Sequence, residues 1–152
     1  MKRASGIRRA REWDASEAID RVVLDAGDRQ RRRIVLTGEK GTTFLLDLEK
    51  PAPLRDGDGL VLDDGAIVRV AGQPEPLLEI AAKTPLVLVR LAWHLGNRHT
   101  DVQIAGDKLR IRRDHVLEEM VRGLGAAVTA VEAQFDPEAG APGHHHEHDH
   151  DS

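Results

Sequence analysis

The stretch TPLVLVRLAWHLGNRHTDVQIAGDKLRIRRD, residues 84–114, decides the predicted fold of the second half of the chain. Thr84 can cap a helix and Pro85 suits the first helical position. The apolar run that follows them predicts a helix over residues 85–95. Gly96 and Asn97 are residue types that accept a left-handed turn, so the helix is expected to end there.

The rest of the stretch predicts a hairpin and the start of a second helix. Residues 101–106 and 107–113 are two short strands with a turn at Gly106-Asp107. Asp114 can cap a helix over residues 115–125. That helix carries its apolar residues on one face, namely Val116, Leu117, Met120, Val121 and Leu124.

Strands are predicted on both sides of these elements. LLEIAA, residues 77–82, precedes the first helix, and AAVTAVEAQF, residues 126–135, follows the second. The resulting order is strand, helix, strand, strand, helix, strand, which is the order of a split βαβ motif. We therefore predict a ferredoxin-like βαββαβ domain over residues 76–135.

The first half of the chain, residues 1–75, predicts an all-β domain. Short β-branched runs occupy residues 34–38, 42–48, 60–65 and 66–72 and are separated by Gly, Asp and Pro. Asp64-Gly65 between two runs predicts a hairpin, whereas residues 15–25 fit either a helical turn or a strand. GQPEP, residues 72–76, is a predicted hinge. The expected fold class is α+β.

The remaining segment, residues 136–152, predicts a flexible, disordered tail. DPEAGAPG is rich in Pro, Gly and Ala, and HHHEHDHDS follows it. The tail holds five acidic residues and no Lys or Arg, within a chain whose net charge is −4. The body before the tail is therefore nearly neutral.

Composition excludes several classes of function. The chain has no cysteine, so it has neither disulfides nor thiolate metal sites. It has no phosphate-binding loop of the P-loop type and no nucleophile motif around its serines, so we do not expect an enzyme. Three basic clusters, residues 8–11, 29–33 and 110–113, lack interleaved aromatics, which favours solvated surfaces over nucleic-acid binding.

Targeting signals are also not evident. The N-terminal MKRASGIRRAREWD is basic but has no apolar segment behind it, unlike a signal peptide. The longest apolar run, Leu86 to Leu95, is too short to span a bilayer. We expect a cytoplasmic protein.

The histidine-rich tail is the strongest chemical signal. His144, His145, His146, His148 and His150 are interleaved with Glu147, Asp149 and Asp151. Imidazoles with neighbouring carboxylates bind borderline divalent metals such as Ni(II), Cu(II), Zn(II) and Co(II) without a fold. Acids alternating with histidines are more typical of a native tail than of a purification tag.

His99 is the candidate ligand in the body of the chain. It follows a helix that is more apolar than one sheet contact requires, which favours association with a second copy. Two His99 side chains that meet across a two-fold axis would form a two-nitrogen site with open coordination positions. His94 is interpreted as a partly buried or interfacial helix residue. His115 is either a secondary ligand or simply a first-turn residue.

The sequence also resembles a known family. LAWHLGNRH (91–99) with VQIAGDKLRIRRDHVLEEMVRGLG (102–125) is similar to the UreE family of urease accessory proteins. FLLDLEKPAPLRDGDGLVLDDGAIVRVAGQPEPLLEI (44–80) is similar to the β-domain and hinge of that family. The resemblance therefore covers nearly the whole predicted folded body.

The resemblance implies a nickel metallochaperone. It implies a dimer formed through the ferredoxin-like domain, one Ni(II) held between two copies of His99, and further ligands from the tail histidines. Its implied partners are the urease accessory GTPase and apo-urease. Some members carry a second histidine two residues before the position of His115, where this chain has Arg113.

We therefore expect a homodimeric nickel chaperone that delivers Ni(II) to apo-urease, with Zn(II) or Cu(II) as other ions for the same ligands in vitro. Two alternatives remain at this stage. One is a divalent-metal buffer or sensor without a dedicated client. The other is a peptide-binding module, because the β-domain has open strand edges.

Overall fold

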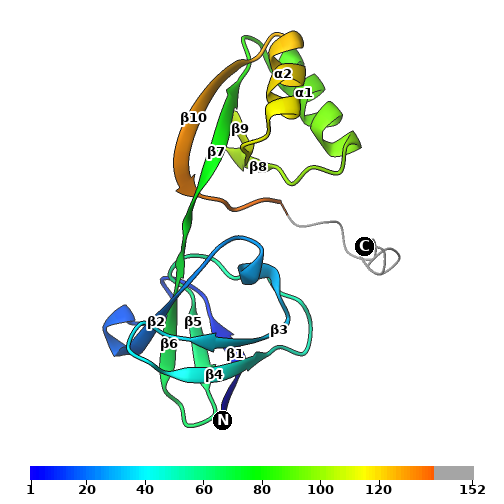
Figure 1. Ribbon diagram of the computed structural model, residues 1–152. Coiled ribbons are helices and arrows are strands. Elements are labelled where there is room, and N and C mark those ends of the chain that lie inside the picture. Colours follow the sequence, from blue (N-terminus) through cyan, green and yellow to red (C-terminus); the bar gives the residue numbers. More distant parts are fainter. Residues whose placement is uncertain (139–152) are drawn as a thin grey trace. The chain divides into compact units, whose positions relative to one another are not determined.

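The computed structural model describes residues 1–138, which form two compact units (Figure 1). The first unit contains residues 1–76 and 132–135, and the second contains residues 77–131 and the described residues from 136 onward. The predicted histidine-rich tail lies almost entirely outside the described residues. No helix within residues 1–138 is long and apolar enough to cross a membrane.

The first unit is a six-stranded sheet with the strand order β2-β6-β5-β1-β4-β3. Its core is formed by fully buried side chains such as Phe44, Leu46, Leu60 and Val70. The elements are β1 (Lys2–Arg8), η1 (Ala15–Glu17), β2 (Ala18–Leu24), η2 (Asp28–Gln30), β3 (Arg33–Thr37), β4 (Thr43–Asp47), β5 (Gly59–Leu62) and β6 (Ile67–Gly72).

The sequence predicted most of these strands. β5 and β6 form the antiparallel hairpin expected at Asp64-Gly65, and Gly65 takes a φ of 89° that favours glycine. The ambiguous residues 15–25 contain both alternatives, a short 3₁₀ turn followed by β2. Strand β1 was not predicted, because its alternation of basic and small residues gives no apolar run.

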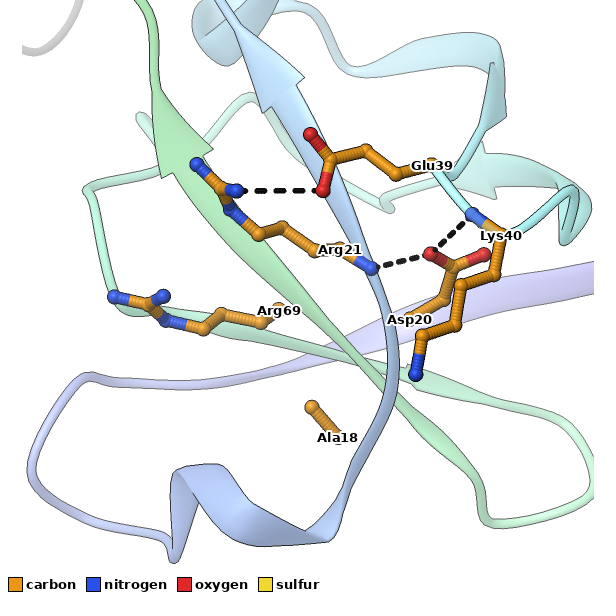
Figure 2. A pocket seen from close by; sticks show the side chains of 6 residues that line it. All are labelled: Ala18, Asp20, Arg21, Glu39, Lys40 and Arg69. Atoms are coloured by element: carbon orange, nitrogen blue, oxygen red, sulfur yellow. Dashed lines mark hydrogen bonds and ion pairs between the residues drawn. The ribbon is translucent and has the colours of Figure 1, made fainter.

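Asp20 ties edge strand β2 to the turn between β3 and β4. Asp20 is 4% exposed, and its carboxylate accepts hydrogen bonds from the backbone N–H groups of Arg21 at 2.7 Å and Lys40 at 2.9 Å (Figure 2). It accepts a third from the backbone N–H of Thr42 at 3.1 Å. Burial alone would raise the pKa of Asp20, but the N–H groups of Lys40, Arg21 and Thr42 and the Thr42 hydroxyl outweigh it and lower that pKa to about 2. A Cβ at Gly38 would lie 2.3 Å from this carboxylate, so the turn requires glycine there.

Arg29 binds the segment after β10, where the chain re-enters the first unit. Its side chain is buried and donates to the carbonyl oxygens of Leu24, Leu54 and Phe135, the last at 2.6 Å. Phe135 is itself fully buried. The end of the last strand is therefore anchored in the core of the first unit.

The second unit has the predicted order of elements. They are β7 (Pro74–Ala81), α1 (Pro85–Asn97), β8 (Gln103–Ala105), β9 (Lys108–Arg112), α2 (His115–Gly123) and β10 (Ala127–Gln134). The strand order is β10-β7-β9-β8, and both helices lie on one side of this sheet (Figure 1). Leu78, Ile80, Leu91, Leu95 and Ile111 form the centre of its core.

The start of β7 and the packed face of α2 differ from the sequence-based expectations. β7 begins at Pro74, so residues 74–76 of the predicted hinge are extended strand. The packed face of α2 is also narrower than predicted, because Val116 is exposed while Val121 is buried. Val116 lies in the first turn of the helix, where the chain has only just left the sheet.

Candidate metal centre

Helix α1 presents His99 through the geometry of its C-terminus. The helix starts as predicted, with the Thr84 side chain accepting a hydrogen bond from the N–H of Val87 at 3.2 Å. The prediction of a left-handed turn at Gly96-Asn97 is wrong. The helix continues to Asn97, Arg98 is the C-cap, and the left-handed residue is His99 with φ 58°.

Backbone hydrogen bonds explain this conformation. The N–H of His99 donates to the carbonyl of Gly96 at 3.0 Å, and the N–H of Thr100 donates to the carbonyl of Leu95 at 3.2 Å. These two bonds are those of a Schellman motif, which requires a left-handed residue one position beyond the C-cap. Because Gly96 is still helical, that requirement falls on His99.

Helix α2 ends in the same motif but places glycine at that position. Gly125 has φ 97°. Its N–H donates to the carbonyl of Arg122 at 3.0 Å, and the N–H of Ala126 donates to the carbonyl of Val121 at 3.0 Å. A left-handed conformation costs a side-chain-bearing residue about 1–2 kcal/mol and glycine almost nothing. Strain of this kind concentrates at functional positions, which supports a role for the His99 imidazole beyond folding.

Helix α1 has apolar side chains that do not pack on the sheet and remain exposed in the single chain. Leu91 and Leu95 are buried against the sheet, whereas Leu86, Val89 and Trp93 are 57%, 64% and 62% exposed. The three exposed residues follow helical spacing and form one stripe on the other side of the helix. We call Leu86, Val89 and Trp93 the α1 stripe.

His94 and His115 have different surroundings. His94 is half-buried, and its ring lies edge-on to Trp93 with centroids 5.0 Å apart, which suits the structural interpretation. His115 is the first residue of α2, as predicted, and is exposed. Its Nε2 lies 3.1 Å from a carboxylate oxygen of Glu119. Sequence reasoning missed Glu119, although its spacing of four residues from His115 could have revealed it.

Within residues 1–138, no group of three or more His, Asp or Glu side chains is arranged to hold a metal ion. The predicted tail ligands, which lie outside the described residues, are His144, His145, His146, His148 and His150. Among the described residues, His99 is therefore a candidate ligand without a second donor beside it, and a complete ligand set would need donors from elsewhere.

Comparison with known proteins identifies the family. Residues 2–72 match the family model for the UreE urease accessory protein, N-terminal domain, and residues 75–152 match that for its C-terminal domain. The chain belongs to the UreE family of urease accessory proteins. UreE proteins are accessory chaperones and not enzymes.

Individual UreE relatives are similar along most of the chain. The urease accessory protein UreE of Rhodopseudomonas palustris (strain HaA2) is 56% identical over 147 residues, which cover 97% of this chain and 68% of the relative. That of Bradyrhizobium sp. (strain ORS 278) is 56% identical over 149 residues, covering 96% and 70%. That of Chelativorans sp. (strain BNC1) is 44% identical over 142 residues, covering 88% and 90%.

Proposed function

We propose that this protein carries Ni(II) and delivers it to apo-urease during assembly of the urease active site. Membership of the UreE family supports a role in urease maturation. The observation that carries the proposal is His99, an exposed imidazole held in a strained left-handed conformation where the α2 counterpart is glycine.

The proposed nickel site lies between two copies of the chain. The α1 stripe packs against the same stripe of a partner, because a two-fold interface is self-complementary. The two His99 side chains then supply two imidazole nitrogens to one ion. Water or other ligands fill the remaining positions, so the ion can leave for its destination.

The tail histidines capture the ion before it reaches this site. His144, His145, His146, His148 and His150 bind Ni(II) at neutral pH, since the imidazoles are then mostly unprotonated. Because the tail is tethered to the body, transfer to His99 is intramolecular and benefits from a high effective concentration. His115, with the carboxylate of Glu119 beside it, is a secondary ligand.

Delivery takes place in the cytoplasm, in a complex with the urease accessory GTPase and apo-urease. The chain itself supplies no nucleotide-binding loop, so energy-dependent steps belong to the partner. The same ligands bind Zn(II) and Cu(II) in vitro, because imidazole suits all three ions.

The delivery proposal is tested in cells that produce urease at limiting nickel with this protein as their UreE. We expect His99→Asn to lower the nickel content of purified urease severalfold, because asparagine accepts the left-handed conformation but is a poor nickel ligand. The matched control, His94→Asn, removes a neighbouring histidine and should leave urease loading unchanged. Equal loading with both variants would contradict the proposal.

A further inference from the structure

The first three residues of the predicted tail, 136–138, are held on the second unit beside β8 (Figure 1). The backbone N–H of Asp136 donates to the side-chain oxygen Oε1 of Gln103 at 3.1 Å. The N–H of Glu138 donates to the carbonyl oxygen of Val102 at 2.8 Å. The proline between them is buried. We call residues 136–138 the tail root, because the histidine-rich part of the chain follows them.

The residues that hold the tail root belong to the packed part of the second unit. Val102 packs against the hydrophobic core of this unit. Gln103 is the first residue of β8 and is paired with Arg110 of β9. Arg110 is in turn fixed by an ion pair of 2.8 Å with Glu79 of β7. The tail root is therefore attached to a strand of the sheet and not to a free loop.

The point of attachment lies close to His99 along the chain. Val102 is three residues after His99, and the tail root runs from Gln103 toward Val102, which is toward His99. The first tail histidine, His144, is six residues beyond Glu138. Six extended residues span about 20 Å and three span about 10 Å. His144 can therefore reach His99 of the same chain.

The two hydrogen bonds of the tail root shorten the tether that carries the histidines. Without them, the preceding attachment is Phe135, whose carbonyl oxygen is held by Arg29 in the first unit. Phe135 is nine residues before His144, whereas Glu138 is six residues before it. The effective concentration of a tethered group falls roughly as the −3/2 power of tether length, so this change alone would lower it about twofold. The tether would also start on the unit that does not contain His99.

We propose that Gln103 is a positioning residue for nickel transfer from the tail to His99. Its side chain holds the tail root, so the tail histidines start beside the loop that carries His99. Gln103 acts through the backbone of Asp136 and not as a metal ligand. The inference rests on the proposed function and deepens it, because it names what places the tail near the site.

The test measures how much the tail histidines strengthen nickel binding at the tight site. Competition with a chelator gives the nickel affinity of full-length protein, at less than one ion per two chains, with the five tail histidines intact and with all five replaced by glutamine. We call the ratio of the two affinities the tail enhancement. We expect Gln103→Leu, which has no acceptor oxygen, to lower the tail enhancement at least about twofold. Glu138→Pro removes the other N–H donor and should act in the same way.

Two further variants separate positioning from a general structural effect. Gln103→Glu keeps an acceptor oxygen at the same place and should retain the tail enhancement. Gln30→Leu changes an exposed glutamine of the first unit and should leave it unchanged. Each variant is measured with and without the tail histidines, so a disturbance of the His99 loop itself alters both affinities and cancels in the ratio.

The assignment is overturned if Gln103→Leu and Glu138→Pro keep the wild-type tail enhancement, or if the wild-type affinities with and without tail histidines are equal. An equal loss in Gln103→Glu or in Gln30→Leu would also contradict it, because the acceptor oxygen would then not be the cause. Absence of any tight site in the protein without tail histidines would contradict the nickel proposal itself, and this inference with it. Failure of the positioning role is therefore distinguishable from failure of the proposed function.

Discussion

His99 has a positive φ, as do five glycines and one other non-glycine residue, Arg11, within residues 1–138. The Schellman bonds at the end of α1 impose this conformation, and the imidazole gains no compensating hydrogen bond of its own among the described contacts. An energetic cost at an exposed position is what motivates the proposal that the His99 imidazole binds a ligand.

The cost at His99 is measurable in metal-free protein. We expect the His99→Gly protein to be about 1 kcal/mol more stable than the His99→Ala protein, since only glycine relieves the left-handed strain. Urea unfolding of both variants provides the measurement. At the equivalent position of α2, Gly125→Ala should lower the free energy of unfolding by a similar amount. Indistinguishable stabilities of the two His99 variants would mean that the helix end is not strained.

Asp20 makes the free energy of unfolding of the first unit depend on pH. Its pKa is lowered from 3.8 to about 2 on folding, so its contribution is complete above pH 3.8 and is lost as the pH falls toward 2. The shift corresponds to about 2 kcal/mol. Asp20→Asn should therefore destabilise the protein at pH 7 by at least about 2 kcal/mol, with a gap that narrows between pH 4 and pH 2.

Urea unfolding across that pH range checks the Asp20 prediction. The control is Asp107→Asn, in the exposed β8–β9 turn, which should leave the curve of stability against pH nearly unchanged. A gap between wild type and Asp20→Asn that stays constant from pH 5 to pH 2 would contradict the account of this carboxylate.

At the scale of elements, helix α1 serves two surfaces. Leu91 and Leu95 pack on the sheet of the second unit, while Leu86, Val89 and Trp93 remain exposed. Burying such a stripe against a second copy is favourable at about 25 cal/mol per Å² of apolar area, before the cost of association. Burial of the α1 stripe would therefore favour the dimer in which the two His99 side chains are proposed to meet.

Val89→Glu tests the α1 stripe. A carboxylate buried near the two-fold axis should weaken dimer association by at least about 3 kcal/mol, on the order of 100-fold, while the exposed position leaves the monomer fold intact. Sedimentation equilibrium measures the association. Val35→Glu, at an exposed position of β3 in the first unit, is the matched control. If Val89→Glu and Val35→Glu associate equally well, the α1 stripe is not the interface.

At the scale of the whole molecule, the sequence predicted the α+β class and the order of elements in the second unit, because caps, turns and apolar periodicity are local signals. It did not predict β1, whose pairing with β4 and β5 is decided by distant partners. It also expected the left-handed residue at Gly96-Asn97, because both types accept that conformation, whereas the helix continues through Asn97 and the Schellman hydrogen bonds place that conformation at His99.

Of the candidate site, the sequence predicted the residue but not its backbone conformation, because local patterns do not show hydrogen bonds. His99 was identified from its place after an apolar helix, but its left-handed backbone follows from hydrogen bonds that only the structure shows. The hydrogen bonds of Asp20 join residues about twenty positions apart, and no local pattern in the sequence marks them.

The central claim is that one nickel ion is shared by two copies of His99, and nickel stoichiometry tests it most directly. The measurement is a nickel titration of full-length protein whose five tail histidines are replaced by glutamine, with the mass of the complex followed by light scattering. We predict one tightly bound ion per two chains, lost in His99→Asn and retained in His94→Asn. One tight ion per single chain, or unchanged tight binding in His99→Asn, would contradict the claim.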